Sequence, residues 1–269
     1  PNVAKFQSGT INLKFMQDLA KISVEDRGPI LVQELLKKVG VVLGTGGSRG
    51  LVHIGVLKVL EKNKIPIHRI NGCSIGAVIA AAYASGMSAK EMENRSLIIN
   101  WEKFCHKGAL IPFLGSVNIT KIKQFLYDVF GDKKFSELKI PLEVVTTELM
   151  PNLEFKTRAI NSGKLVPAIM ASISVPFFFK IVKFQSSAVF DGGVFDPLPV
   201  DMMEQEVDVI ITSTVHARHI INKKNRIISI YTDTGKLSWL DYSKVRECIK
   251  LGELAARERI GSIKRVVGG

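Results

Sequence analysis

The chain has 269 residues, which is enough for one α/β domain with its own hydrophobic core. Hydrophobic residues make up 46% of it and charged residues 23%, and these values exclude a disordered or fibrous protein. The formal net charge of +12 favours an anionic partner, either nucleic acid or an anionic membrane surface, with a well-solvated surface as the alternative.

Other features of the composition narrow the choice of partner and compartment. We find no zinc-ligand spacing, no RNA-binding aromatic motif and no basic heptad region, so no nucleic acid partner is expected. Cys73, Cys105 and Cys248 are odd in number and widely spaced, which argues against a disulfide framework and for a reducing compartment. No transmembrane stretch or signal peptide is visible, although the chain begins at Pro1 without a Met. We therefore expect a cytoplasmic protein, with peripheral contact to the inner face of an anionic membrane left open.

The first half of the chain alternates between strand and helix patterns. Residues 1–38 predict a helical extension that packs on the core, on another copy or on a membrane. A short apolar strand at 39–43 runs into the glycine-rich segment 44–50, and helical periodicity follows at 51–60. A second strand is expected at 65–70, then a tight turn and a very apolar helix around 77–83.

The second half continues the pattern and sets the fold class. Residues 88–130 are mostly helical and looped, and the later predicted strands and helices are 142–147, 153–158, 162–172, 188–190, 207–214, 226–232 and 241–266. The pattern indicates an α/β fold: a three-layer sandwich with a central, mostly parallel sheet and helices on both faces. We expect an N-terminal extension (1–38), a catalytic domain (39–240) and a C-terminal helix packed on the same domain (241–269).

The segment Gly72-x-Ser74-x-Gly76 places a serine at a sharp turn between a strand and a helix. Such a turn exposes the hydroxyl at the carboxyl end of the sheet, and the flanking glycines relieve backbone crowding. The helix that follows directs its amino-terminal dipole at developing negative charge. The bland alternative is a tight turn with a capping serine.

Consecutive glycines in the 44–50 loop let backbone amides point into one concavity, where they bind a phosphate or an oxyanion. A dinucleotide site fits poorly because Arg49 stands where the third glycine is needed, and no Gly-Lys-Ser/Thr is present for a P-loop. Arg49 either supports the loop or meets a lipid phosphate, and we favour loop support. The third motif is Asp191-Gly192-Gly193, an aspartate at a strand end with room to approach another loop, or an ordinary Asp-Gly turn.

Together, in this order and spacing, the segments 41–57, 72–77 and 191–200 resemble the patatin-like phospholipases, over roughly residues 39–215. The segment 171–176 also resembles one that recurs in bacterial members. The resemblance implies an α/β fold, a Ser–Asp dyad in place of a triad, and hydrolysis of acyl esters in phospholipids, lysophospholipids or neutral lipids, with no metal or cofactor. Thr45 departs from the pattern, because the family's loop usually has glycine there.

By position, the resemblance makes Ser74 the nucleophile, with Asp191 as its base. It places Gly46, Gly47 and Ser48 in the oxyanion loop. The residues expected to support these motifs are Arg49, Gly50, Gly72, Gly76, Gly192 and Gly193.

Alternatives remain open at this stage. His216 and His219 follow Asp191 in the order that a Ser–Asp–His triad requires, so only the resemblance favours a dyad. A catalytically silent lipid-binding or regulatory module and a nucleotide-binding protein are the other function classes. Phe177–Phe179 and the basic C-terminal helix are candidate membrane contacts.

Overall fold

A computed structural model describes residues 5–6, 9–10, 37–99, 104, 118–176, 182–184, 187–219 and 226–268. The chain divides into two compact units, Pro1–Lys37 and Lys38–Gly269. In the first unit, strands β1 (Lys5–Phe6) and β2 (Gly9–Thr10) pair antiparallel. The helices predicted within 1–38 lie outside the described residues.

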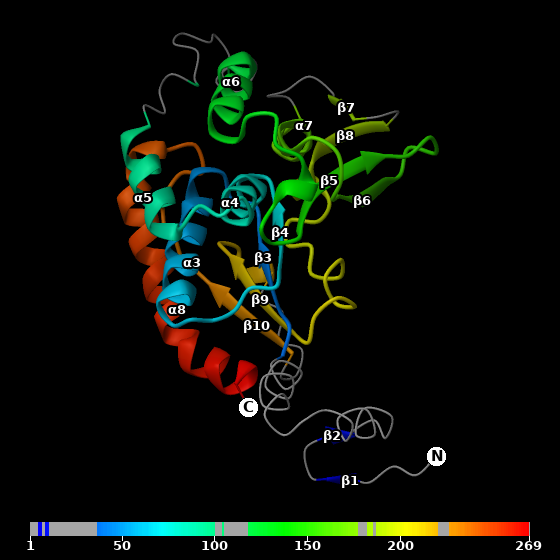
Figure 1. The fold of residues 1–269 in the computed structure, drawn as a ribbon. Helices are drawn as coiled ribbons and strands as arrows, with labels where there is room; N and C mark the ends of the chain where they lie inside the picture. The colour runs from blue at the N-terminus through cyan, green and yellow to red at the C-terminus, as the bar shows by residue number, and fades with distance from the viewer. Residues whose placement is uncertain are drawn as a thin grey trace. The chain divides into compact units, whose positions relative to one another are not determined.

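The second unit is built on an eight-stranded sheet in the order β10-β9-β3-β4-β5-β8-β7, with β6 also paired to β5 (Figure 1). Four of its seven strand pairings are parallel, namely those that link β10, β9, β3, β4 and β5. The strands are β3 (Val39–Leu43), β4 (Arg69–Cys73), β5 (Leu142–Leu149), β6 (Phe155–Ile160), β7 (Val182–Phe184), β8 (Ser187–Asp191), β9 (Val209–Thr214) and β10 (Ile227–Tyr231).

One face of the sheet carries the main core. Alternate residues of β3 and β9, such as Val41 and Ile211, are fully buried there under four helices, as strand alternation requires. The helices are α3 (Val52–Lys62), α4 (Ile75–Ala84), α7 (Leu165–Ser172) and α8 (Val245–Val267), with α5 (Ala89–Ile98) packed on α3 and α6 (Ile119–Phe130) on α7.

The opposite face has a smaller core made by Val42, Ile210 and Ile227 with apolar side chains from residues 198–207. Within the described residues this layer is rich in turns and holds no helix, since Pro197 and Pro199 interrupt the segment. The predicted α/β fold with a central, mostly parallel sheet and helices is confirmed, although three of the seven pairings are antiparallel. The covering of this second face is less regular than the helices expected there.

The second predicted strand starts later than expected. Helix α3 ends in a turn with Lys64 at φ 56°, and Pro66 lacks the amide that a ladder needs. The strand therefore begins at Arg69 instead of residue 65, and it runs up to Cys73 directly before the turn at Ser74.

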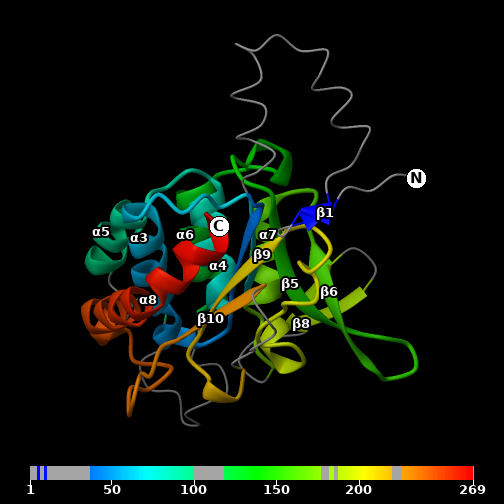
Figure 2. The ribbon, with the colours of Figure 1, turned by 90° about the horizontal axis from the view of Figure 1, so that it is seen from below.

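Helices α3 and α8 cross with their backbones in contact (Figures 1 and 2). A Cβ on Gly55 would lie 2.0 Å from the Ile249 oxygen, and one on Gly252 would lie 2.0 Å from the Val52 oxygen. Glycine on both sides is what permits this approach.

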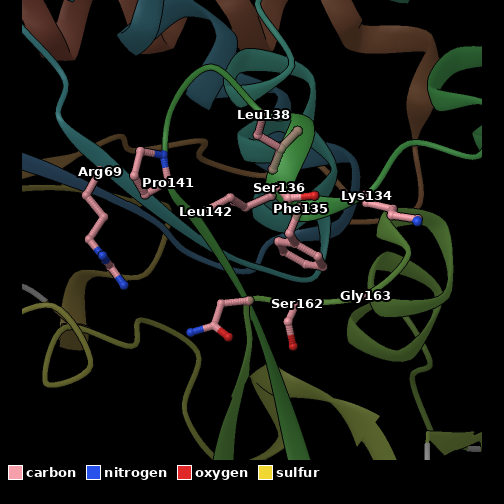
Figure 3. A pocket seen from close by; sticks show the side chains of 10 residues that line it. Arg69, Lys134, Phe135, Ser136, Leu138, Pro141, Leu142, Ser162 and Gly163 are labelled. Carbon is pink, nitrogen blue, oxygen red and sulfur yellow. The ribbon is translucent and has the colours of Figure 1, made fainter.

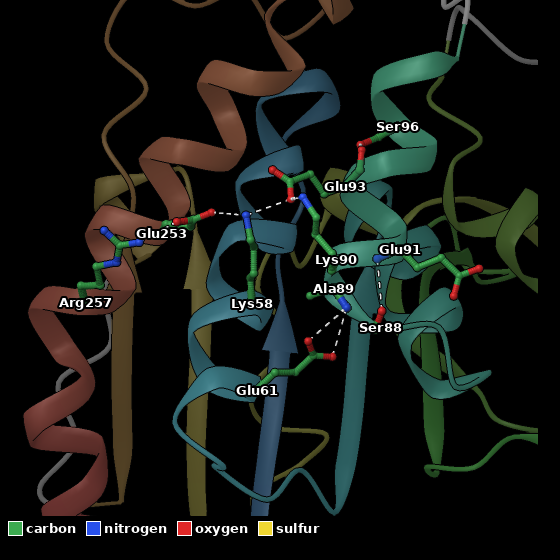
Figure 4. Close-up of polar contacts among 10 residues, drawn as sticks. All are labelled: Lys58, Glu61, Ser88, Ala89, Lys90, Glu91, Glu93, Ser96, Glu253 and Arg257. Atoms are coloured by element: carbon green, nitrogen blue, oxygen red, sulfur yellow. Dashed lines mark hydrogen bonds and ion pairs between the residues drawn. The ribbon is translucent and has the colours of Figure 1, made fainter.

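Lys58 on α3 joins three helices (Figure 4). Its ammonium lies 2.5 Å from Glu253 of α8 and 2.9 Å from Glu93 of α5. Glu61, also on α3, accepts from the Ala89 amide at the start of α5. These contacts hold α5 and α8 in place beside α3. None of the helices in the described ranges is long and apolar enough to cross a bilayer.

Candidate active site

Ser74 stands at the turn between β4 and α4. Its backbone has φ 56° and ψ −124°, a region that non-glycine residues seldom adopt. A Cβ on Gly72 would come 2.4 Å from the Gly76 oxygen, and a Cβ on Gly76 would come 2.3 Å from the Leu43 oxygen. Both flanking glycines are therefore required for this tight turn, as the sequence predicted.

The sheet register brings Ser74 and Asp191 together across β5. Cys73 is paired with Val145 on one side of β5, and Asp191 is paired with Thr146 on the other. The Ser74 hydroxyl donates to Asp191 Oδ2 at 2.5 Å, and the Gly193 amide donates to Oδ1 at 2.8 Å. The two predicted dyad residues, 117 positions apart in the chain, are thus in direct hydrogen-bond contact.

Close packing against β5 explains why a glycine, Gly192, follows the aspartate. A Cβ at this position would lie 2.6 Å from the Val145 oxygen and 2.9 Å from Cys73 Sγ. Gly193 is also close to a neighbouring loop, because its Cβ would lie 2.9 Å from Thr45 Oγ1. The Asp-Gly-Gly motif therefore lets this turn lie against both β5 and the glycine loop.

The environment of the dyad shifts the pKa values of two side chains, Asp191 and Cys73. Asp191 is 3% exposed, and burial raises its pKa to about 6, against the hydrogen bonds from Ser74 and Gly193 that lower it. The carboxyl is still mostly ionised at pH 7 and able to accept a proton. Burial, followed by the charge of Asp191, raises the pKa of the Cys73 thiol well above its ordinary value. Cys73 is thus a neutral, buried side chain and a poor nucleophile.

Ser172, the last residue of α7, and Ser174, just after it, support the two dyad residues, a role that was not predicted from the sequence. The Ser74 amide donates to Ser172 Oγ at 2.9 Å, and that hydroxyl donates to the Val145 oxygen. The Asp191 amide donates to the Ser174 oxygen. The only signal in the sequence was that 171–176 resembles a recurring family segment.

The glycine loop is held at two points. The Thr45 amide donates to the Pro197 oxygen at 3.0 Å, and the Ser48 amide donates to the Trp239 oxygen at 2.8 Å. Between them, the amides of Gly46 and Gly47 donate to no group in the described part of the chain. Of the three residues predicted for the oxyanion loop, Gly46 and Gly47 therefore have available donors, whereas the Ser48 amide is engaged.

His53 anchors the start of this loop. It is fully buried, with Nε2 2.9 Å from the Gly44 oxygen and Nδ1 2.7 Å from Ser213 Oγ. Burial lowers its pKa to about 4, so the ring is neutral at pH 7. Only Nε2–H can serve the carbonyl, so Nδ1 accepts from the hydroxyl. These contacts of His53 with Gly44 and Ser213 were not predicted from the sequence.

Arg49 and Gly50 lie at the end of the glycine loop, after Gly46, Gly47 and Ser48. A Cβ on Gly50 would come 2.2 Å from Ile75 Cγ2, so glycine is needed where the loop meets the start of α4. The positive charge of Arg49 contributes to lowering the pKa of His216, after burial. Arg49 Nε is buried and has no hydrogen-bond partner within the described residues.

His216 and His219, the triad candidates, do not reach the dyad. Their rings meet edge to face, with the ring centroids 5.3 Å apart, and His219 Nε2 accepts from Arg218. Both Asp191 oxygens are already occupied by Ser74 and Gly193. Within the described ranges, no histidine is hydrogen-bonded to either dyad residue.

A separate cavity of about 470 Å³ lies at the other end of the sheet (Figure 3). Arg69 and Leu142, which begin β4 and β5, line it together with Phe135 and Ser162. Ser74 follows the opposite, carboxyl end of β4, so this cavity is no part of the dyad site. The described residues also contain no group of three His, Cys, Asp or Glu side chains suited to a metal ion.

Comparison with known sequences identifies the family to which the chain is similar. The family model described as Patatin-like phospholipase matches residues 41–203. An uncharacterized NTE family protein of Mycobacterium tuberculosis is 30% identical over 170 residues, covering 61% of this chain and 44% of that protein. The lysophospholipase nte1 of Aspergillus fumigatus is 30% identical over 177 residues, covering 62% of this chain and 11% of that protein. The chain thus spans less than half the length of these relatives.

Solved structures agree on the fold. VipD from Legionella pneumophila superposes with a TM-score of 0.54 at 12% identity, covering 84% of this chain and 67% of that one. ExoU from Pseudomonas aeruginosa, in complex with SpcU, gives 0.51 at 14% identity, covering 87% and 53%. At such low identity these likenesses bear on the fold alone.

Proposed function

The chain belongs to the patatin-like phospholipase family, and on that premise we propose that it is a serine hydrolase of lipid acyl esters, with Ser74 as nucleophile and Asp191 as base. The observation that supports this most is the 2.5 Å hydrogen bond from the Ser74 hydroxyl to a buried aspartate. A serine hydroxyl is a weak nucleophile and needs such an acceptor for its proton.

In the acylation step, Ser74 Oγ attacks the ester carbonyl carbon while its proton passes to Asp191 Oδ2. The carbonyl oxygen becomes an oxyanion, which the amides of Gly46 and Gly47 stabilise as donors that lack another partner among the described residues. The intermediate then collapses: the ester C–O bond breaks, Asp191 returns the proton to the leaving alcohol, and the acyl group stays on Ser74.

In the deacylation step, Asp191 takes a proton from a water molecule that attacks the acyl-Ser74 carbonyl. The second tetrahedral intermediate releases a free fatty acid, and the proton returns to Ser74 Oγ. No step is assigned to a metal ion or cofactor. The backbone strain at Ser74 and the bond from its amide to Ser172 keep the hydroxyl fixed throughout.

The substrate class that we propose is a phospholipid or lysophospholipid. One relative, the Aspergillus fumigatus protein, is named a lysophospholipase. The net charge of +12 favours peripheral contact with an anionic membrane, and we place the activity at its cytoplasmic face.

Active-serine labelling tests the dyad directly. We expect a fluorophosphonate to label the wild type, to fail with Ser74→Ala, and to react at least about 10³-fold more slowly with Asp191→Asn. The His216→Ala/His219→Ala double variant serves as the control and should label normally. Loss of labelling in that control would make the enzyme a triad hydrolase. A folded wild type that does not label at all would leave a catalytically silent lipid-binding module.

A further inference from the structure

Two pairs of exposed apolar side chains lie in segments next to the candidate active site. Val194 and Phe195 come directly after Asp191-Gly192-Gly193 in the chain and are 47% and 55% exposed. Trp239 and Leu240 are 37% and 42% exposed. Single exposed apolar side chains are common on protein surfaces. A cluster of large ones in neighbouring segments indicates a binding surface.

Backbone contacts place these two pairs on either side of the glycine loop. The Thr45 amide donates to the oxygen of Pro197, two residues after Phe195. On the other side, the Ser48 amide donates to the oxygen of Trp239 itself, and the Ser48 hydroxyl donates to the Ser238 oxygen. The segments 193–197 and 238–240 therefore flank the Gly46–Gly47 donors, and they hold the loop that stands beside Ser74.

We propose that Val194, Phe195, Trp239 and Leu240 form a lipid-contact surface that inserts into the headgroup region of a phospholipid bilayer around the mouth of the active site. This inference rests on the proposed lipid substrate. Tryptophan and phenylalanine are side chains that favour the boundary between water and hydrocarbon. Insertion at this position would bring the ester of a membrane lipid to Ser74 without the lipid crossing bulk water.

Charge supports a bilayer as the occupant. The chain carries a net charge of +12, which draws it to an anionic surface. Around Trp239 and Leu240 the charges of the chain balance, with Lys236 and Lys244 against Asp233 and Asp241, and Phe195 is followed by the acidic Asp196. Contact at this surface therefore depends on the apolar side chains, and the overall charge adds attraction at longer range.

Fluorescence of Trp239 tests the contact. The chain has two tryptophans, so Trp101→Phe leaves Trp239 as the only one, and adding Ser74→Ala prevents turnover. We expect a blue shift on addition of phosphatidylcholine vesicles with or without phosphatidylglycerol, and quenching when the lipids carry bromine near the headgroup. An unshifted, unquenched spectrum with both vesicle types would overturn the inference.

Variants separate apolar contact from simple charge attraction. In the same background, Phe195→Ser with Leu240→Ser should lower the vesicle partition coefficient by about tenfold or more, because two apolar side chains lose their burial. Leu254→Ser on α8, a residue 45% exposed, is the matched control and should partition as before. Binding that needs phosphatidylglycerol, disappears in salt and survives the double variant would instead assign the contact to a basic surface. A dimer that the double variant dissociates, with no vesicle binding, would make this surface a contact with a second copy.

Labelling keeps this inference separable from the proposed function. The Trp101→Phe protein with Ser74 intact is incubated with the soluble fluorophosphonate in the absence of vesicles. Labelling without vesicle contact would overturn only the proposal of a lipid-contact surface. Vesicle contact without labelling would overturn the hydrolase proposal and indicate a lipid-binding module.

Discussion

Asp191 combines burial with a charge that the proposed chemistry needs. Its raised pKa, about 6, predicts that kcat/KM for a soluble ester falls as the pH drops through about 6, because only the ionised carboxylate accepts the Ser74 proton. Above that pH the rate should reach a plateau. A pH profile between 4.5 and 8.5 measures it, and a rate that stays constant down to pH 4.5 would contradict Asp191 as the base.

The same burial makes Asp191 costly for the fold. Its pKa rises from an ordinary 3.8 to about 6 on folding, so its contribution to stability is fully present below pH 3.8 and is lost as the pH rises through about 6. Asp191→Asn is neutral at every pH, and its amide and carbonyl suit Ser74 and Gly193. We expect this variant to be more stable than the wild type at pH 8, by roughly 1–3 kcal/mol.

Denaturant unfolding at pH 8 and pH 4 checks the sign of this effect. The difference between Asp191→Asn and the wild type should shrink at pH 4, where both side chains are uncharged. A variant that is less stable than the wild type at pH 8 would mean that the ionised carboxylate is stabilised by its hydrogen bonds more than it is penalised by burial.

Ser172 is a positioning residue, since it acts on Ser74 only through the backbone. Ser172→Ala removes the acceptor of the Ser74 amide and the donor to the Val145 oxygen. We expect a loss of about 1–3 kcal/mol in stability, and a fall of about tenfold in kcat with little change in KM. Ser174→Ala is the control, because among the described residues its hydroxyl donates to the Met170 oxygen and contacts neither dyad residue. If the two variants label with fluorophosphonate equally fast, Ser172 has no special role.

At the scale of elements, the close crossing of α3 and α8 sets how the C-terminal helix packs on the domain. Gly252→Ala would place a methyl group 2.0 Å from the Val52 backbone oxygen, so the helices have to separate. We predict a loss of at least about 2 kcal/mol in the free energy of unfolding.

The same helix offers a matched control for that change. Apart from the backbone of its own helix, no atom of the described residues lies within 4 Å of a Cβ added to Gly261, so Gly261→Ala should stabilise the protein by up to about 1 kcal/mol through helix propensity. Thermal unfolding of both variants measures the contrast. Equal effects of the two substitutions would show that the α3–α8 contact contributes little to stability.

The units that local patterns specify are the ones that the sequence predicted well. The strand at 39–43 and its glycine loop, and the turn at Ser74 with its apolar helix, follow from residues that are neighbours in the chain. The start of β4 was misplaced because Ile65 and Ile67 have strand-like side chains, whereas Pro66 and the turn at Lys64 keep the backbone out of the ladder.

Interactions between distant residues could not be read in the same way. Ser172 is 98 positions from Ser74, and Ser213 is 160 positions from His53. No local pattern records which serine will meet which backbone amide once the sheet has formed. The hydrogen bond from the Ser48 amide to the Trp239 oxygen is of the same kind, so the sequence could not show that this amide of the predicted oxyanion loop already has an acceptor.

At the scale of the whole molecule, the catalytic unit is contained in one part of the chain. Both hydrophobic clusters, the dyad, the glycine loop and its two holding segments belong to the unit Lys38–Gly269. The family match, at 41–203, also falls inside it. Residues 1–37 form a separate unit, so every group proposed for the reaction lies in the second unit.

We therefore predict that a fragment of residues 38–269 folds cooperatively and keeps its reactivity. Its Ser74 should label with a fluorophosphonate at a rate within about threefold of the full chain, because every group proposed for the reaction lies within the fragment. The fragment with Ser74→Ala gives the background. A fragment that stays monomeric and folded but does not label would show that residues 1–37 take part in forming the site. One that aggregates, although the full chain does not, would show that they cover apolar surface which the second unit leaves exposed.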